Sequence, residues 1–229
     1  MQYKFNCMEE YKIQKIDSLF PLIHELNAEI KSLYAKFFKI MNFKHDPIVS
    51  DKDIYRFYQQ HKETQHTGIK ILRNSVSLLK LTAHQPLWEI IKKSWGLQNP
   101  ILEAHPILRC DLPNESQLRF LRHQDYPYNL GSVNSLTVWI PLQSVDHELG
   151  CLRVAPGSSE KNYPHQDGLI DPEINFDWKE LPMQVGEVLS FSQRLVHESG
   201  TNNSKNFKIR FTAILRVSDY GHSSYTIKN

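Results

Sequence analysis

Two histidines and one aspartate have the residue types and spacing needed to hold a metal ion. His123 and Asp125 form a His-x-Asp triplet in RFLRHQDYPYNLGSVNSLTVWIPL, and His197 lies far downstream in LSFSQRLVHESG. Residues two apart on an extended chain point to the same face, so His123 and Asp125 can bind one ion together. Two histidines and one carboxylate, with three coordination positions left open, form the facial site of non-haem Fe(II) oxygenases. We therefore predict that His123, Asp125 and His197 bind iron.

A second copy of the triplet, His165-Gln166-Asp167, shows that the pattern alone is weak. His123 ends one strand-like run and precedes another, whereas His165 lies among turn-forming residues with no periodic strand on either side. Metal ligands need rigid elements to hold them. We assign the metal site to the first triplet and treat the second as a decoy, with a supporting or lid role as the alternative.

A basic residue downstream of His197 has the chemistry to bind an anionic cosubstrate. Alternation along a strand-like run places four residues on one face, namely Arg210, Thr212, Ile214 and Arg216. A buried arginine is costly unless it pairs with an anion, and its planar guanidinium suits a carboxylate. Ser199, two residues after His197, adds a hydroxyl donor. The alternative is that Arg210 is exposed or forms a structural ion pair.

The elements that would position these residues change type near residue 100. Apolar periodicity predicts helices over 18–41, 50–61, 67–81 and 86–96. Asp17 or Ser18 is expected to cap the first helix, Ser50 the second, while Pro86 and Gly96 bound the last. Short β-rich runs separated by turn residues then cover 101–109, 117–122, 135–142, 151–154, 187–192 and 208–217. This order predicts an α+β chain with a mainly β sandwich or barrel, supported by helices.

The division of the chain follows from the same pattern. We expect one domain over 1–229, with mostly helical support in 1–99 and the β core in 100–217. The irregular stretch 158–179 is too long for a simple turn. We interpret it as a lid or binding loop, with a surface excursion as the alternative.

Composition excludes several classes of protein. The 229 residues carry a formal net charge of +2, so no strong field favours nucleic acid or an anionic membrane. Three cysteines without a Cys-x-x-Cys pair fit a reducing compartment. The first residues contain acids where a signal peptide has an apolar run, and no stretch approaches the length of a membrane span. We expect a cytoplasmic protein without nucleic-acid or membrane partners, and the oligomeric state stays open.

The order of several motifs adds a family resemblance. HQDxPY, NSLTVWIPL, GCLRVAPGSS, GEVLSF, VHESG and IRFTAILRV follow one another across roughly 100–217. This order resembles the phytanoyl-CoA dioxygenase family of Fe(II)- and 2-oxoglutarate-dependent oxygenases. The resemblance implies a double-stranded β-helix (a cupin-like jelly roll) with the N-terminal helices packed on one sheet. It implies Fe(II) at His123, Asp125 and His197, with Arg210 and Ser199 binding the distal carboxylate of 2-oxoglutarate. It makes Gln124 a further contact to that cosubstrate.

The resemblance also implies a reaction. A small-molecule substrate would be hydroxylated with O2, releasing succinate and CO2, and no protein acid or base is needed beyond the metal ligands. Ser159 stands where the family often has histidine, which affects the local loop and not the iron ligands. The carboxylate of Asp125 favours hydroxylation over halogenation. Two alternatives remain, a cupin-like metal enzyme that does not use 2-oxoglutarate and a non-catalytic jelly-roll binding module.

Overall fold

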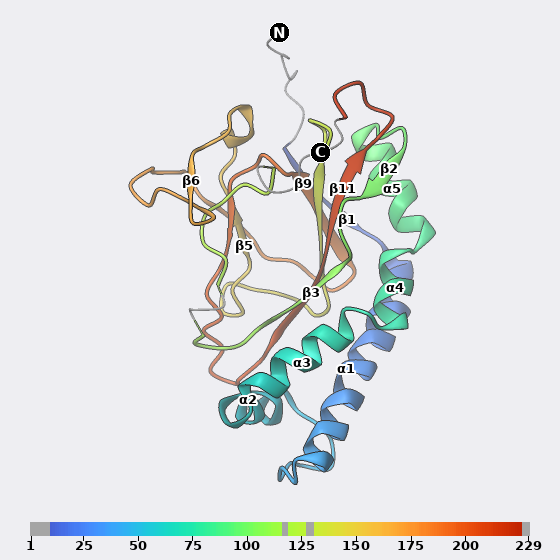
Figure 1. Ribbon diagram of the computed structural model, residues 1–229, viewed down its shortest axis with the longest axis vertical. Coiled ribbons are helices and arrows are strands. Elements are labelled where there is room, and N and C mark those ends of the chain that lie inside the picture. Colours follow the sequence, from blue (N-terminus) through green and yellow to red (C-terminus); the bar gives the residue numbers. More distant parts are fainter. Residues whose placement is uncertain (1–9, 116–118, 127–130, 226–229) are drawn as a thin grey trace.

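Two antiparallel sheets form the β core of the protein, and helices cover the outer face of one of them (Figure 1). The structure is a computed structural model that describes residues 10–115, 119–126 and 131–225. The helices are α1 (Phe20–Ile40), α2 (Asp51–Gln60), α3 (Lys62–Leu72), α4 (Val76–Thr82) and α5 (Gln85–Trp95). The strands are β1 (Tyr11–Lys15), β2 (Pro100–Leu102), β3 (Ile107–Asp111), β4 (Leu136–Pro141), β5 (Leu152–Val154), β6 (His165–Gln166), β7 (Leu169–Ile170), β8 (Lys179–Leu181), β9 (Glu187–Ser192), β10 (His197–Ser199) and β11 (Arg210–Asp219).

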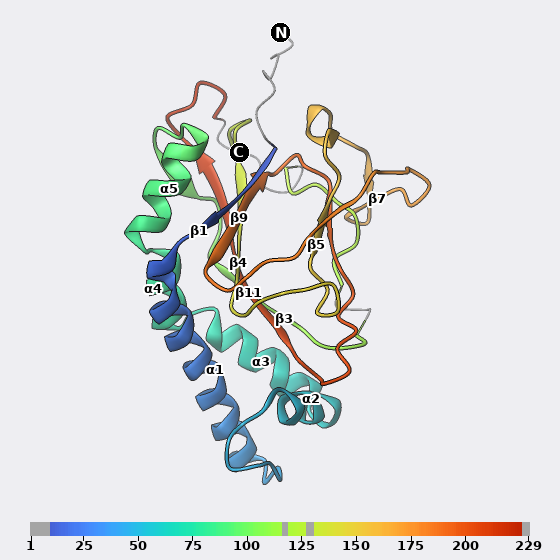
Figure 2. The same ribbon diagram turned by 180° about the vertical axis from the view of Figure 1, so that it is seen from behind.

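The larger sheet has the strand order β1-β9-β4-β11-β2, and β3 also pairs with β11. The smaller sheet has the order β10-β5-β8. Figure 2 shows β1 lying along β9, with β5 in the layer that faces them. Two facing antiparallel sheets with helices packed on one of them are the architecture that the sequence predicts.

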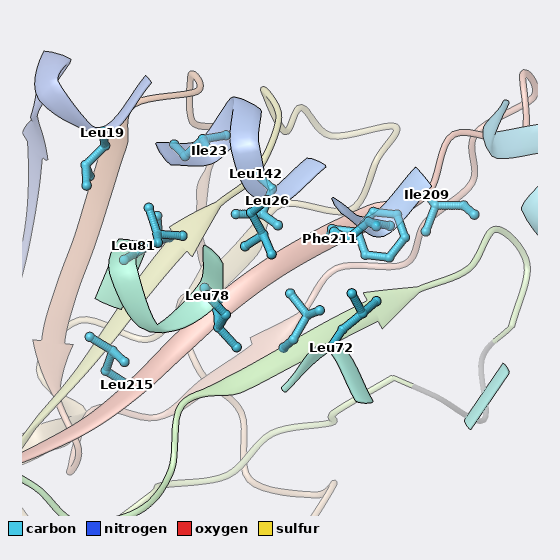
Figure 3. Packing of buried hydrophobic residues seen from close by; sticks show 14 of the residues in the cluster. Leu19, Ile23, Leu26, Leu72, Leu78, Leu81, Leu142, Ile209, Phe211 and Leu215 are labelled. Atoms are coloured by element: carbon cyan, nitrogen blue, oxygen red, sulfur yellow. The ribbon is translucent and has the colours of Figure 1, made fainter. Parts of the chain in front are cut away.

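The strand β11 separates two apolar clusters because its side chains alternate between the two faces of the sheet. Phe211 and Leu215 belong to the cluster that includes residues of α1 and α4 (Figure 3). Ile214 belongs instead to the cluster between the two sheets, with Leu189 and Phe191. Helices therefore stabilise one face of β11, which leaves the other face to line the inside of the jelly roll.

Most helix boundaries agree with the sequence prediction, and one helix was predicted wrongly. The Ser50 side chain accepts from the Asp53 N–H in a capping box at the start of α2. The left-handed Gly96, at φ 62°, ends α5. The predicted helix over 67–81 is instead two helices, α3 and α4, because the Ser75 hydroxyl caps a new helix at the Leu78 N–H.

Other differences from the sequence prediction concern short elements. The first helix begins with a 3-10 turn over Asp17–Leu19 and has no side-chain cap. The predicted strand over 101–109 is divided into β2 and β3 by residues that include Pro106, which lacks a backbone donor. The predicted strand over 117–122 lies partly outside the described residues, and its described part, 119–122, is not a strand. The sequence prediction missed β1, β8 and β10, which have few residues or weak alternation. It also missed β6 and β7, a short hairpin inside the stretch 158–179 that was predicted to be irregular and that contains His165.

Candidate metal centre

The three predicted metal ligands meet at one point between the two sheets. His123 Nε2 lies 3.6 Å from Asp125 Oδ1, and His197 Nε2 lies 3.6 Å from Asp125 Oδ2. All three ligand atoms lie within 4.8 Å of one another, and all three residues are buried. The spacing that placed His123 and Asp125 on one face is therefore matched by a third ligand from β10.

Backbone hydrogen bonds place the two histidines directly opposite each other. The His123 N–H donates to the His197 carbonyl at 3.1 Å, and the His197 N–H donates back at 3.0 Å. Residues that exchange both bonds across an antiparallel pair carry their side chains on the same face. The Asp125 N–H then donates to the Gln193 carbonyl at 2.9 Å, which continues the pairing. The ligand geometry thus rests on the main chain.

Each histidine ring is fixed in the tautomer that suits a metal. His123 Nδ1 lies 2.7 Å from the Leu121 carbonyl, and His197 Nδ1 lies 2.9 Å from the Leu195 carbonyl. A carbonyl only accepts, so each Nδ1 carries the proton and each Nε2 presents its lone pair. Outer hydrogen bonds of this kind orient metal-bound histidines in other proteins.

The Asp125 carboxylate is held by two donors and stays ionised. The Thr137 hydroxyl donates to Oδ2 at 2.6 Å, and Arg216 Nη2 donates to Oδ1 at 2.8 Å. Burial alone would raise the pKa of Asp125, but the positive charge of Arg216 outweighs it and that pKa lies well below its usual range. The carboxylate is therefore an anionic ligand at any pH near neutrality.

His197 remains neutral for the opposite reason. Burial and the neighbouring His123 lower the pKa of His197 to about 3, although Asp125 opposes the shift. Its ring also packs edge-on against Phe191, with centroids 4.7 Å apart. A neutral imidazole is the form that binds a metal ion.

A cavity of about 180 Å³ opens beside the ligands. His123, His197 and Ser199 line it, together with Thr137 and Trp139 of β4. The remaining lining residues are Arg73, Ile107, Arg109, Phe120, Leu152, Phe191, Ile214 and Arg216. A larger groove of about 940 Å³ between α5 and β2 contains none of the predicted site residues.

Arg210 lies inside the jelly roll but does not line this cavity. Its side chain is 3% exposed and pairs with Asp111, with Nη2 3.1 Å from Oδ2. Arg109, which does line the cavity, forms an ion pair with the same carboxylate. Arg210 Nη1 is buried without a hydrogen-bond partner among the described residues. Two guanidinium groups therefore contact the single carboxylate of Asp111.

Gln124 points away from the cavity, although it lies between two metal ligands. Its amide nitrogen donates to the carbonyls of Lys161 and Arg194, and its amide oxygen accepts from the Tyr163 N–H at 2.8 Å. The side chain is fully buried. These bonds attach the HQD segment to the long loop, so the amide that was predicted to contact a cosubstrate is occupied by backbone groups.

The decoy triplet has a structural role of its own. His165 Nε2 accepts from the Gln124 N–H at 3.0 Å, and its Nδ1 lies 2.8 Å from the Tyr163 carbonyl. The stretch 158–179 also carries a small apolar cluster that contains Phe176 and Trp178. The loop is therefore packed against the segment that carries the metal ligands.

Two basic residues of the site were not singled out from the sequence. Arg216 was placed on the same strand face as Arg210 but given no role, whereas it contacts the Asp125 ligand. Arg109 was placed in a predicted strand without a partner. The signal for Arg216 was its even spacing from Arg210, since both must point into the jelly roll.

The residues present fit an iron ion. Two imidazole nitrogens and one carboxylate oxygen are the donor set of the non-haem iron facial site. Ligand atoms about 2.1 Å from a common ion and at right angles to each other lie about 3 Å apart, near the separations found here. Neither Nε2 atom carries a proton, so both lone pairs can bind an ion.

Comparisons with known proteins agree with this geometry. The family profile described as phytanoyl-CoA dioxygenase (PhyH) matches residues 107–210. The peroxisomal phytanoyl-CoA dioxygenase of Bos taurus is 26% identical, covering 70% of this chain and 60% of that protein. A methylphosphonate hydroxylase of Gimesia maris is 33% identical over 38% of this chain and 35% of its own. This chain thus spans about 60% of the length of the bovine relative.

A solved structure confirms the fold. The epimerase SnoN in complex with Fe3+, alpha ketoglutarate and nogalamycin RO matches with a TM-score of 0.61 at 18% identity, covering 93% of this chain and 80% of that one. At 18% identity this likeness shows a shared fold and no more. The predicted jelly-roll class and the predicted family resemblance are both confirmed.

Proposed function

We propose that this chain, which resembles the phytanoyl-CoA dioxygenase family over residues 107–210, is an Fe(II)- and 2-oxoglutarate-dependent dioxygenase. The observation that carries the proposal is the convergence of His123, Asp125 and His197, with both Nε2 atoms free for a metal. When bound, iron and 2-oxoglutarate supply the oxidation, in which a C–H bond and O2 become C–OH while 2-oxoglutarate gives succinate and CO2.

The chain's own residues hold and orient the ion. Thr137 and Arg216 fix the two oxygens of Asp125, while backbone carbonyls fix the two imidazoles. Phe191 and Trp139 give the cavity apolar walls. Apolar walls exclude water, which protects the cosubstrate from oxidation in the absence of substrate.

We assign the distal carboxylate of 2-oxoglutarate to Arg210, with Ser199 as a second donor. Three observations support this assignment. Arg109 and Arg210 both contact Asp111, which places two guanidinium groups near the cavity. Arg210 Nη1 has no partner among the described residues, so a carboxylate oxygen would satisfy it. Ser199 lines the cavity that contains both histidines.

The substrate in this proposal is a small molecule with an anionic group. Arg73 and Arg109 lie where the cavity meets a groove of about 580 Å³ between α3 and β3, and Phe120 lines both hollows. Methylphosphonate, named for one relative, carries such a group. A substrate that reaches from the ligands past Phe120 would place its anion beside these guanidinium groups.

A cytoplasmic location completes the proposal. Cys110 and Cys151 are both free thiols, which agrees with a reducing compartment. Among the helices that the structure describes, none combines the length and the apolar character needed to cross a bilayer.

The first test is the visible spectrum of the anaerobic protein with Fe(II) and 2-oxoglutarate. A metal-to-ligand charge-transfer band is expected, and Arg210→Ala should greatly weaken it at limiting 2-oxoglutarate. Lys208→Ala is the matched control, because it removes an exposed positive charge two residues away. Bound iron without the band would favour a metal enzyme that does not use 2-oxoglutarate. Failure to bind iron would favour a non-catalytic binding module.

A further inference from the structure

A second group of metal-binding side chains lies outside the iron centre. His147, Cys151 and Glu180 each offer one ligand atom, and these atoms lie within 4.8 Å of one another. His147 Nδ1 is 2.6 Å from Glu180 Oε2 and 3.8 Å from Cys151 Sγ. None of the three lines the cavity beside the iron ligands. This group, here called the HCE cluster, has no role in the reaction proposed above.

The backbone presents two of these ligands together. His147 and Cys151 lie four residues apart on one tight turn, closed by the Cys151 N–H donating to the Asp146 carbonyl at 3.0 Å. Gly150 is left-handed at φ 77°, and a Cβ there would lie 2.7 Å from the backbone of Gly200. The turn therefore cannot easily relax, and the two side chains stay on one side of it.

The third ligand comes from a neighbouring strand. Glu180 is the middle residue of β8 and pairs with Arg153 of β5, the strand that begins directly after Cys151. Its side chain is 46% exposed and that of His147 is 65% exposed, so solvent reaches the cluster. The cluster thus joins two segments that are already held side by side by the smaller sheet.

We propose that the HCE cluster binds a zinc ion through Cys151 Sγ, His147 Nδ1 and Glu180, with solvent water as the fourth ligand. Thiolate, imidazole and carboxylate are all zinc ligands, whereas calcium and magnesium prefer oxygen alone. In a tetrahedral zinc site a sulfur and a nitrogen ligand lie about 3.6 Å apart, close to the separation of Cys151 and His147.

Binding requires two local changes that the structure permits. The short contact between His147 and Glu180 must open to about 3.3 Å, the separation of two light ligands on zinc. The Glu180 side chain is exposed and can therefore move. Burial, followed by the charge of Glu180, raises the pKa of the Cys151 thiol, so the thiol is protonated in the metal-free chain. Zinc displaces this proton to solvent when it binds the sulfur. In a neutral His147 the ring proton moves from Nδ1 to Nε2, which leaves the Nδ1 lone pair for zinc.

Cobalt(II) distinguishes this cluster from the iron centre. A thiolate ligand gives cobalt an intense near-ultraviolet charge-transfer band, and the iron centre has no sulfur ligand. Titration of the metal-free full-length chain with cobalt(II) should produce this band, and zinc should abolish it. The band should disappear in Cys151→Ser and weaken in His147→Ala. It should persist in Cys110→Ser, Cys7→Ser and His123→Ala.

The iron proposal and the zinc proposal fail separately in this experiment. Absence of the band at saturating cobalt would overturn the zinc site and leave the iron centre untouched. A band that survives in Cys151→Ser but vanishes in another cysteine variant would also overturn it. Glu180→Gln is the variant least affected by misfolding, because this exposed change should leave the fold intact. It should still shift the zinc titration to higher zinc concentration. Equal zinc titrations for Glu180→Gln and the unchanged chain would remove Glu180 as a ligand.

Discussion

The guanidinium of Arg216 lies 2.8 Å from the carboxylate of Asp125, the one acidic ligand of the candidate iron centre. Because Arg216 lowers the pKa of Asp125 and fixes one of its oxygens, removing it should weaken metal binding. Loss of such outer partners lowers metal affinity by about 10–100-fold in other sites. We expect Arg216→Ala to show this loss in an anaerobic Fe(II) titration.

Arg216→Lys provides the control for that change. It keeps the positive charge, and so should recover part of the affinity that Arg216→Ala loses. Circular dichroism must show both variants folded, because breaking a buried ion pair costs about 3–5 kcal/mol. Equal iron affinity in the alanine variant and the unchanged chain would remove Arg216 from the centre.

The fully buried amide of Gln124 predicts a link between the long loop and the metal ligands. Gln124→Met has a similar shape but loses the bonds to Lys161, Arg194 and Tyr163. We expect faster proteolysis within 158–179 and weaker iron binding, both measured on the purified variant. Gln166→Met, in the exposed second triplet, is the matched control and should change neither. Unaltered proteolysis in Gln124→Met would contradict the link.

Acid should destabilise the metal-free chain through His197. The folded chain keeps this residue neutral, with a pKa of about 3, whereas the unfolded chain protonates it below about pH 6.5. Stability is therefore present above pH 6.5 and is lost progressively as the pH falls towards 3. At pH 5.5 the loss from this residue is about 1.4 kcal/mol relative to pH 7.5.

Urea unfolding at these two pH values measures that loss. His197→Asn should show a smaller difference between the two pH values, whatever its absolute stability. His105→Asn, at an exposed position, should retain the full difference. A pH dependence that is the same in all three chains would assign the acid sensitivity to other groups.

The contact between helices and sheet should dominate stability. Leu215 is 1% exposed and lies on the helix-facing side of β11. Leu215→Ala removes buried methyl groups and leaves a cavity, so we expect a loss of about 2–5 kcal/mol in the free energy of unfolding. Ile71→Ala, at a position 49% exposed, is the control and should cost far less. Equal losses in urea unfolding would contradict the packing described for β11.

The convergence of the candidate metal ligands could be predicted in part from alternation, which sequence displays. His123 and Asp125 share a face by their spacing, and the motif order pointed to His197. The helix break at Ser75 was harder, since the apolar pattern continues through it and only a hydroxyl cap marks the new start. Local capping chemistry competes with periodicity there, and periodicity alone gives the wrong answer.

Partners across the fold could not be predicted from sequence. The pairing of Arg216 with Asp125 joins residues 91 positions apart, and no local signal relates them. The same holds for Gln124, whose amide was expected at the cosubstrate and instead contacts loop backbone. Side-chain direction between two packed segments depends on the tertiary arrangement, which one sequence does not display.

The reciprocal backbone bonds between His123 and His197 position the two histidines. Their placement therefore does not depend on which side chains surround the metal centre. Surrounding side chains that permit this bridge between His123 and β10 leave the two imidazoles in the same place. The walls of the cavity can therefore change in size and charge while the ligands stay in register. Single substitutions in such a cavity can change its shape and charge without rebuilding the candidate metal centre.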